Sequence, residues 1–240
     1  MNDITLQQLL EAGCHFGHKA ERWHPKAGGY IYTKKDGIHI IDLAKTKAGL
    51  DLAIAFIKEL VASGKEVLFV GTKRQAKGVL KEEAAAVAAP YFSERWIGGF
   101  LTNWEEVKKN IDKINRLTDE QATGAWKKFP KHERTKLARY LVNIKIYYGG
   151  VLKLTEVPAA LFVVDIKKED TAVREARRVG IPVVAIVDTN SDPTGIDYII
   201  PANDDAVGSV QLITHALTQA YAEGKAKLAK VAAKSQKKKV

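Results

Sequence analysis

The sequence predicts an α/β fold organised around a parallel sheet. Two short apolar runs rich in β-branched residues, 161–164 and 183–187, flank a segment whose apolar residues recur at helical spacing from Ala172 onward. Apolar runs without polar alternation are typical of strands that are covered on both faces, as in parallel sheets. Gly180 and Pro182 then end the helix and return the chain to the sheet, which completes a strand–helix–strand unit.

Apolar spacing and turn residues predict the remaining elements of the sheet domain. They are a helix at 4–12, hairpin strands at 30–33 and 38–41, a helix with its apolar stripe at 50–61, a strand at 67–70, a helix from about 73 to 88, a strand at 198–200 and a closing helix at 206–221. Asp42 or Thr46 caps the helix at 50–61, and Gly64 ends it. For the segment 14–26 we predict a folded loop.

The segment 103–148 predicts an inserted hairpin of two helices. Apolar residues recur at steps of three and four across 104–117 and again across 137–148. One narrow apolar stripe on each helix is typical of an antiparallel two-helix coiled coil that protrudes from its parent domain. Asn103, followed three residues later by Glu106, predicts a capping box at the start of the first helix.

The chain is therefore expected to have three parts. Residues 1–102 and 149–222 form the sheet domain, residues 103–148 form the coiled-coil hairpin, and residues 223–240 form a tail. The tail is rich in lysine and short of large apolar residues, a composition that predicts disorder.

The net charge of +10 is distributed unevenly among these parts. The hairpin carries 11 basic and 6 acidic side chains, and the tail carries 7 and 1. Residues 149–222, in contrast, carry 6 basic and 10 acidic side chains. A polyanion such as RNA is therefore expected to bind the hairpin and the tail, together with the first quarter of the chain, rather than the second half of the sheet domain.

The candidates for RNA contact are basic residues of the first quarter, of the strand ends and of the hairpin. They are His18, Lys19, Arg22, Lys26, Lys73, Arg74, Arg95, Lys108, Lys109, Lys127, Lys128, Lys131 and Arg134. In the first quarter, cations alternate with aromatic rings, a pattern that suits RNA because rings stack on bases and cations neutralise phosphates. Charged runs on helices are also common as solvated faces, and that alternative stays open for each residue.

Lys73 and Arg74 form a second kind of candidate, because they stand where a helix is predicted to begin. A helix N-terminus carries positive potential, so two cations there are a mismatch that a bound anion relieves. The glycine spacing, Gly71 to Gly78, fits neither the P-loop nor the dinucleotide fingerprint. The alternatives are a phosphate site and two solvated surface cations.

A third candidate site is acidic. Asp188, Asp204 and Asp205 follow predicted strands at the edge of the sheet where carboxyl ends collect and where ligands of such folds bind. Asn203 or Asp204 can cap the helix that follows, but capping does not account for Asp188. We expect these carboxylates to hold a divalent cation, Zn²⁺ or Mg²⁺, or a basic group of a partner protein.

Other site chemistries find less support. Cys14, His15, His18 and His24 suggest a zinc site, but their spacing is poor and only one sulfur is present. The strand ends carry no phosphate-binding glycine fingerprint and no nucleophile elbow, so we expect no enzyme activity; an RNA-modifying or sugar-phosphate-binding protein is the alternative.

The single cysteine excludes an internal disulfide. The absence of a signal sequence and of a bilayer-length apolar run predicts a cytoplasmic protein without membrane contact.

Several blocks of the sequence, spread from residue 9 to residue 206, are similar in content and order to the ribosomal protein S-two family of the bacterial small subunit. They read LLEAGCHFGH, HPK, IHIIDLAKT, VLFVGTKRQA, RWIGGFLTNW, PAALFVVD and GIPVVAIVDTNSDPTGIDYIIPANDDA. The resemblance implies a flavodoxin-like three-layer domain with an inserted coiled-coil hairpin. It also implies binding to small-subunit rRNA between head and body, and contact with neighbouring ribosomal proteins, especially the large mRNA-binding ribosomal protein S-one. The lysine-rich tail departs from relatives that end in acidic residues.

Overall fold

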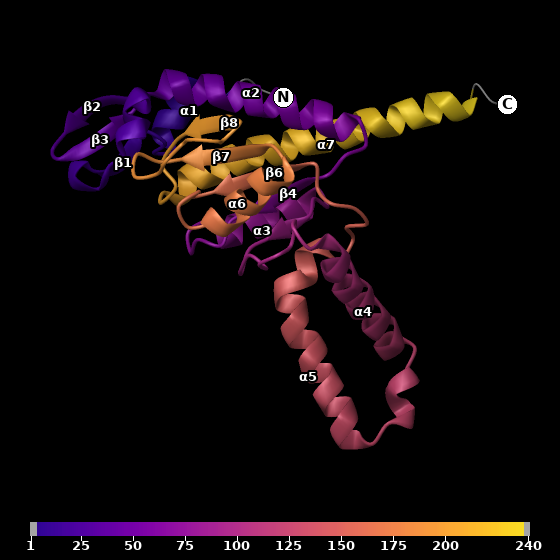
Figure 1. Cartoon of the computed structure of the whole chain (residues 1–240). Helices are drawn as coiled ribbons and strands as arrows, with labels where there is room; N and C mark the ends of the chain where they lie inside the picture. Colours follow the sequence, from indigo (N-terminus) through magenta and orange to yellow (C-terminus); the bar gives the residue numbers. More distant parts are fainter. Residues whose placement is uncertain (1–3, 238–240) are drawn as a thin grey trace.

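The computed structural model describes the backbone of residues 4–237 and the side chains of residues 4–231. A five-stranded parallel sheet forms its centre and confirms the predicted α/β fold (Figure 1). Across the sheet the strands are β5 (Tyr91–Phe92), β4 (Val67–Val70), β6 (Ala160–Val164), β7 (Val183–Val187) and β8 (Tyr198–Pro201). Counted along the chain, this order is 2-1-3-4-5, one of the two common orders of doubly wound sheets.

Successive side chains of each strand enter two separate cores, because neighbouring residues of a strand point to opposite faces of the sheet. Phe162 and Val164 belong to one core, with residues of helices α2 (Leu43–Ala62), α3 (Lys77–Ala86) and α7 (Val207–Lys237). Leu161 and Val163 belong to the other, with helix α6 (Asp170–Val179) and the aromatic segment after β5. Both faces are therefore covered, which explains why the strands read as unbroken apolar runs.

Local signals for helix ends are confirmed at some places and wrong at others. Asp42 caps α2, with its carboxylate accepting from the amide of Ala44, and Gly180 ends α6 with φ of 77°. Asn103 makes no side-chain cap, so the predicted capping box is absent from that helix start. Helix α3 begins at Lys77 and not near residue 73, because residues 71–76 form a loop bound to other parts of the chain.

The N-terminal region forms a second, smaller sheet beside the parallel one. Its strands are β1 (Phe16–Lys19), β3 (Ile38–Ile41) and β2 (Ile31–Lys35), in that antiparallel order. Helix α1 (Leu6–Glu11) precedes them, and 3₁₀ turns η1 (Ala20–Arg22) and η2 (Pro25–Tyr30) join β1 to β2. The predicted β2–β3 hairpin is confirmed, whereas β1 lies in a segment that we predicted to be a loop.

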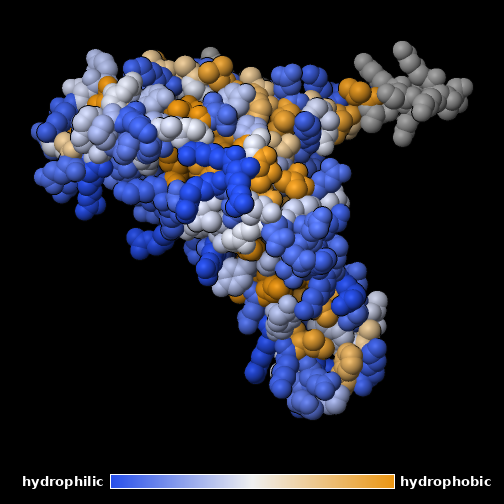
Figure 2. Space-filling model, viewed as in Figure 1, coloured by the Kyte–Doolittle hydropathy of each residue, from blue (hydrophilic) through white to orange (hydrophobic). Residues whose placement is uncertain are grey.

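Two helices project from the sheet domain, as Figure 1 shows. Helix α4 (Trp104–Ala122) leads outward, η3 (Ala125–Lys128) forms the tip, and α5 (Lys131–Tyr148) returns to η4 (Gly149–Val151). Ile114, Leu117, Trp126 and Leu141 form a small core between them. Figure 2 shows hydrophilic surface over much of this arm, with hydrophobic atoms between its helices.

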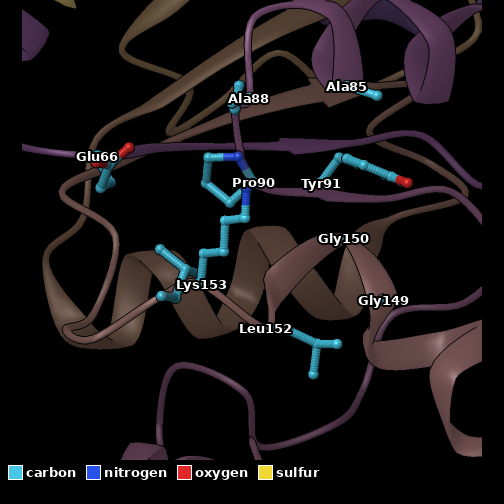
Figure 3. Close-up of a pocket in the computed structure, with 11 residues that line it drawn as sticks. Glu66, Ala85, Ala88, Pro90, Tyr91, Gly149, Gly150, Leu152 and Lys153 are labelled. Carbon is cyan, nitrogen blue, oxygen red and sulfur yellow. The ribbon is translucent and has the colours of Figure 1, made fainter. Parts of the chain in front are cut away.

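The arm joins the sheet domain through a close backbone contact at its base. A Cβ atom at Gly150 would lie 2.3 Å from the carbonyl oxygen of Tyr91, so only glycine fits there without a backbone shift. Beside this contact lies a cavity of about 320 Å³ between residues 88–91 and 149–154 (Figure 3). Val107 and Ile111 of α4 also belong to the core on the α6 face of the sheet, so the base of the arm is held both by this core and by the close approach at Gly150.

The C-terminal segment is helical where we predicted disorder. Residues 223–237 continue α7, and the ion pairs Lys58–Glu223 and Lys225–Glu66 hold the start of this segment against α2 and the residue that precedes β4. Leu228 adds an apolar contact near Gly64. The prediction missed these contacts because their partners lie far away in the sequence; residues 238–240 lie outside the described residues. Within the described chain, no helix is both long and apolar enough to cross a bilayer.

Candidate functional site

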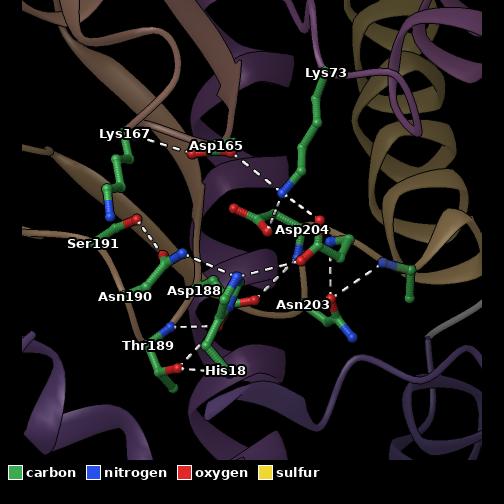
Figure 4. A network of polar contacts seen from close by, with 12 residues as sticks. His18, Lys73, Asp165, Lys167, Asp188, Thr189, Asn190, Ser191, Asn203 and Asp204 are labelled. Atoms are coloured by element: carbon green, nitrogen blue, oxygen red, sulfur yellow. Dashed lines mark hydrogen bonds and ion pairs between the residues drawn. The ribbon is translucent and has the colours of Figure 1, made fainter. Parts of the chain in front are cut away.

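Charged side chains from both sheets meet at the carboxyl edge of the parallel sheet (Figure 4). Lys73 follows β4, Asp165 follows β6, Asp188 follows β7, and Asp204 with Asp205 follows β8, while His18 reaches in from β1. We call these six residues the carboxylate cluster. Parallel strands end at the same edge, which is why residues so distant in sequence lie together.

Lys73 lies at the centre of the cluster. Its ammonium is 2.7 Å from Asp204 Oδ1, 2.6 Å from Asp205 Oδ1 and 3.3 Å from Asp165 Oδ2. Burial disfavours the charge, but the hydrogen bonds to Asp204 and Asp205 and the charges of Asp204 and Asp165 outweigh it and raise the pKa of Lys73. Lys73 is therefore a fixed internal cation.

His18 is the second internal base of the cluster. Its Nδ1 lies 3.0 Å from Asp188 Oδ1. Its Nε2 lies 3.3 Å from Asp205 Oδ2 and 3.0 Å from the side-chain nitrogen Nδ2 of Asn190. The hydrogen bond to Asp188 is the main cause that raises the pKa of His18, and burial opposes it. The imidazole thus tends to carry a proton that the carboxylates stabilise.

Asp204 is the most buried carboxylate of the cluster, with an exposed fraction of 0%. Burial raises its pKa to about 7, and the charges of Asp165 and Asp188 add to this, although Lys73 acts in the opposite direction. Its Oδ1 binds Lys73, while its Oδ2 is buried and has no hydrogen-bond partner within the described residues. A buried carboxylate oxygen without a partner is costly, so it marks a place where a cation is favoured.

The cluster offers donor atoms suited to a divalent cation. One ligand atom each from His18, Asp188 and Asp204 lies within 4.8 Å of the other two. One imidazole nitrogen with two carboxylate oxygens suits Zn²⁺ better than Mg²⁺, which prefers oxygen alone. Asp205, by contrast, is half-exposed at the rim and binds Lys73 and His18.

The amide and the hydroxyl of Thr72, in the loop after β4, are already bound by another part of the protein. The buried carboxylate of Glu169 accepts hydrogen bonds from the amide and the hydroxyl of Thr72, at 2.9 and 2.5 Å. Such loop amides bind the anionic ligand in nucleotide-binding folds, and here a side chain of the protein occupies them. The expected phosphate site at Lys73 and Arg74 is therefore absent: Lys73 faces carboxylates, and Arg74 is exposed outside any helix start.

Comparison with known proteins agrees with the order of the sequence blocks. The family profile described as "Ribosomal protein S2" matches residues 9–224. The chain belongs to this family. The "Small ribosomal subunit protein uS2" of Coprothermobacter proteolyticus is 48% identical over 222 residues, which cover 92% of this chain and 83% of the relative. The protein of the same name from Bdellovibrio bacteriovorus is 44% identical over 224 residues, which cover 93% of this chain and 72% of the relative.

In this S2-family chain, the residues expected to contact RNA separate into two groups. His18 and Lys73 are bound inside the carboxylate cluster and have no charge free for a phosphate. The other eleven are exposed: Lys19, Arg22, Lys26, Arg74, Arg95, Lys108, Lys109, Lys127, Lys128, Lys131 and Arg134. Of these, Lys26 pairs with Asp192 and Lys109 with Glu106. The tip residues Lys127, Lys128 and Lys131 have no ion pair within the described chain.

The structure brings together only some of the residues expected to bind a metal, and metal binding itself stays a prediction. Asp188 and Asp204 do lie together, but the third donor is His18 and not Asp205. The zinc site suggested by Cys14, His15 and His24 is not formed: Cys14 is buried, and the described residues form a group that could hold a metal only around His18. The sequence did show His18 as a possible ligand, but it could not pair it with aspartates about 170 residues away.

Proposed function

We propose that this chain is a structural constituent of the small ribosomal subunit and binds small-subunit rRNA through the arm formed by α4 and α5 and through its N-terminal cations. The observation that carries the proposal is the separation of charge. Cations of the arm tip are exposed and unpaired within the described residues, whereas Lys73 and His18 at the sheet edge are bound by carboxylates. Free cations gain most from phosphate contact, because they release counterions without breaking ion pairs.

The shape of the arm supports RNA contact. Helix α5 has 18 residues and is about 27 Å long at the usual helical rise. Tyr140 lies under the Lys113 ammonium at 5.2 Å, and it is partly exposed, as is Tyr147. Exposed rings beside cations offer stacking surfaces for unpaired bases. We propose that α4 and α5 act as the coiled-coil hairpin expected from the sequence.

The carboxylate cluster serves a different partner. Its carboxylates repel phosphates, so the cluster suits a cation or a basic protein segment. We propose that it holds a divalent cation, Zn²⁺ in preference to Mg²⁺, and that Asp205 at the exposed rim contributes to anchoring ribosomal protein S-one. Phe16, half-exposed on the neighbouring strand β1, offers an apolar contact beside this charge.

This function requires neither a small-molecule substrate nor catalysis, and it places the chain in the cytoplasm with the ribosome. The runner-up is an RNA-modifying enzyme. A nucleotide cofactor would need the loop amides after β4, and the Thr72 amide of this loop already donates to Glu169, which argues against this alternative.

The test is co-sedimentation of the purified chain with small subunits that lack it, through a high-salt gradient. We expect the chain to travel with the subunits in a one-to-one ratio and to show no turnover of nucleotides or phosphosugars. A chain that stays at the top of the gradient while remaining folded contradicts the proposal. A chain in which Lys65, Lys81 and Lys153 are reversed in charge serves as the matched control, because these exposed lysines lie outside the proposed RNA surface and the variant should still co-sediment.

A further inference from the structure

A cavity at the carboxyl edge of the sheet adjoins the carboxylate cluster through Asn190, which contacts His18, but none of the six cluster residues lines it. It has a volume of about 380 Å³ and lies between the loop after β6, the loop after β7 and helix α6. Ile166 and Val173 form apolar lining, while Lys167, Arg177, Asn190 and Ser191 supply polar groups. Crevices outside the carboxyl ends of parallel strands are the usual ligand sites of such sheets.

The charges around this cavity do not cancel. Asp192 is paired with Lys26 at 2.9 Å, and Asp170 is paired with Arg174 at 2.8 Å, so both lining carboxylates are already neutralised. Lys167 and Arg177 have no carboxylate within ion-pair distance in the described part of the chain. The cavity therefore carries two uncompensated positive charges, which favour an anionic ligand.

The positions of the two cations are set differently. Arg177 donates from Nε to the carbonyl of Gly195 at 3.1 Å and from a terminal nitrogen to the carbonyl of Thr194. These bonds fix the guanidinium and leave other N–H groups for a ligand, since guanidinium has five donors. The Lys167 side chain extends toward Ser191 (Figure 4), and Lys167 is an exposed residue.

The polar groups of the cavity can also read a base. The Ser191 hydroxyl donates to Asn190 Oδ1 at 2.8 Å and keeps its acceptor capacity, and His24 lines the same wall. His24 Nδ1 accepts from the amide of Lys26, so Nε2 carries the proton in the neutral ring and is a donor. Donors and acceptors above an apolar floor suit a heteroaromatic ring with a polar edge.

We propose that this cavity binds one unpaired nucleotide of RNA, with its phosphate at Lys167 and Arg177 and its base on the apolar lining. The volume suits one nucleotide and is too small for a helix of paired bases. Lys26 and Arg22, which belong to the proposed RNA-binding surface, lie on the N-terminal segment that borders the cavity at His24. The inference rests on the proposed RNA binding of the chain, and it adds a site that reads a single unpaired position.

The first test measures the binding of nucleoside 5′-monophosphates to the purified full chain, by calorimetry or by NMR chemical-shift changes. We expect binding of monophosphates, weaker binding of the corresponding nucleosides, and weaker binding of inorganic phosphate. Lys167→Met should weaken monophosphate binding about fivefold, the effect of losing one partly exposed ion pair. The matched control is Lys168→Met, because Lys168 donates to the Thr72 carbonyl outside the cavity and should leave binding unchanged.

Three results overturn the inference: no binding of any monophosphate, equal binding of phosphate alone, or equal effects of the two lysine variants. Lys167 is exposed and has no side-chain partner within the described residues, so loss of folding is not expected from its replacement.

The second test separates RNA from free nucleotides as the source. Small subunits reconstituted with the Lys167→Met chain should show one unpaired rRNA nucleotide with increased chemical reactivity relative to subunits with the Lys168→Met chain. Subunits that contain the protein but show no such local change contradict this inference and leave the proposed function intact. A wild-type chain that does not enter subunits contradicts the proposed function itself.

Discussion

The Asp204 carboxylate and the Lys73 ammonium lie 2.7 Å apart, inside a site where three further carboxylates gather. The pair joins the loop after β4 to the segment after β8, which are 131 residues apart in the sequence. A buried charge of this kind is stable only while its partner is present, and removal of one partner leaves the other uncompensated. The cluster thus links the two halves of the sheet edge as well as offering a cation site.

Asp204 makes stability depend on pH in a defined direction. Its pKa is raised to about 7 in the folded chain from an ordinary value of 3.8, so between these values the folded state binds more protons than the unfolded state. Stability is therefore expected to fall as pH rises from about 4 to about 7. Asp204→Asn should remove part of this fall, on the order of 2 kcal/mol.

The measurement is urea unfolding of wild type and Asp204→Asn at several pH values, with a chelator present. The quantity compared is the change in unfolding free energy across the pH range, not its absolute value, because the substitution also alters the bond to Lys73. Parallel curves for the two proteins would show that Asp204 stays ionised throughout.

Gly150 should be much less tolerant of substitution than its neighbour Gly149. A Cβ at Gly150 would lie 2.3 Å from the Tyr91 carbonyl oxygen, whereas a Cβ at Gly149 has no atom within 4 Å. We expect Gly150→Ala to lower the free energy of unfolding by about 1–3 kcal/mol, the usual cost of overpacking, and Gly149→Ala to change it little. Urea unfolding of the two variants provides the comparison; equal effects would mean that the junction relaxes freely.

Much of the fold could be predicted because burial on both faces leaves a clear sequence pattern. The strands at 67–70 and 183–187 were predicted at their observed bounds, and the strand at 161–164 was one residue short. The predicted end of α6 at Gly180 is also confirmed. These features depend on local periodicity and on backbone preferences, which the sequence shows directly.

The carboxylate cluster could be predicted only in part because its contacts are long-range. The strand-end aspartates were recognised, since parallel strands end at one edge. Lys73 was misassigned to a phosphate because nothing near it in the sequence shows that it faces three carboxylates, and its helix begins four residues later than predicted. The helical continuation of α7 past residue 222 was missed for the same reason.

The lysines at the tip of the arm should determine a measurable part of the salt dependence of subunit binding. Changing Lys127, Lys128 and Lys131 to Glu replaces exposed cations with charges that phosphates repel. We expect weaker incorporation and a smaller slope of log affinity against log salt, by about 0.7–0.9 for each phosphate that the variant no longer neutralises. Filter binding to small-subunit rRNA at several salt concentrations measures this slope.

A matched control changes the same number of charges elsewhere. Lys65, Lys81 and Lys153 are exposed on the sheet domain and lie outside the proposed RNA surface. Reversing them should leave the slope nearly unchanged. If both triple variants reduce the slope equally, net charge alone governs binding and the arm has no special role.

Asp188 and Asp205 should differ in what they support, because only one of them belongs to the group that can hold a metal. Asp188 lies beside His18 and Asp204, whereas Asp205 is half-exposed and pairs with Lys73 at the rim. Asp188→Asn is therefore expected to weaken Zn²⁺ binding by about 100-fold, since it removes a charged ligand, and Asp205→Asn to change it less than tenfold. Competition with a chromogenic zinc chelator measures both values.

The double variant Asp188→Asn with Asp205→Asn tests the partner. The carboxylates are poorly placed to meet phosphates, so binding to rRNA should stay within about twofold of wild type, while retention of ribosomal protein S-one on the subunit should fall. Quantitative mass spectrometry of purified subunits measures both proteins at once. Loss of the chain itself from the subunit would mean that the carboxylates serve the fold, because an unfolded sheet edge cannot present the N-terminal cations. Full retention of both proteins would mean that S-one binds elsewhere.

The matched control replaces two exposed aspartates on α2 and α4, Asp51→Asn with Asp112→Asn. It makes the same charge change away from the cluster and should leave the retention of S-one unaltered.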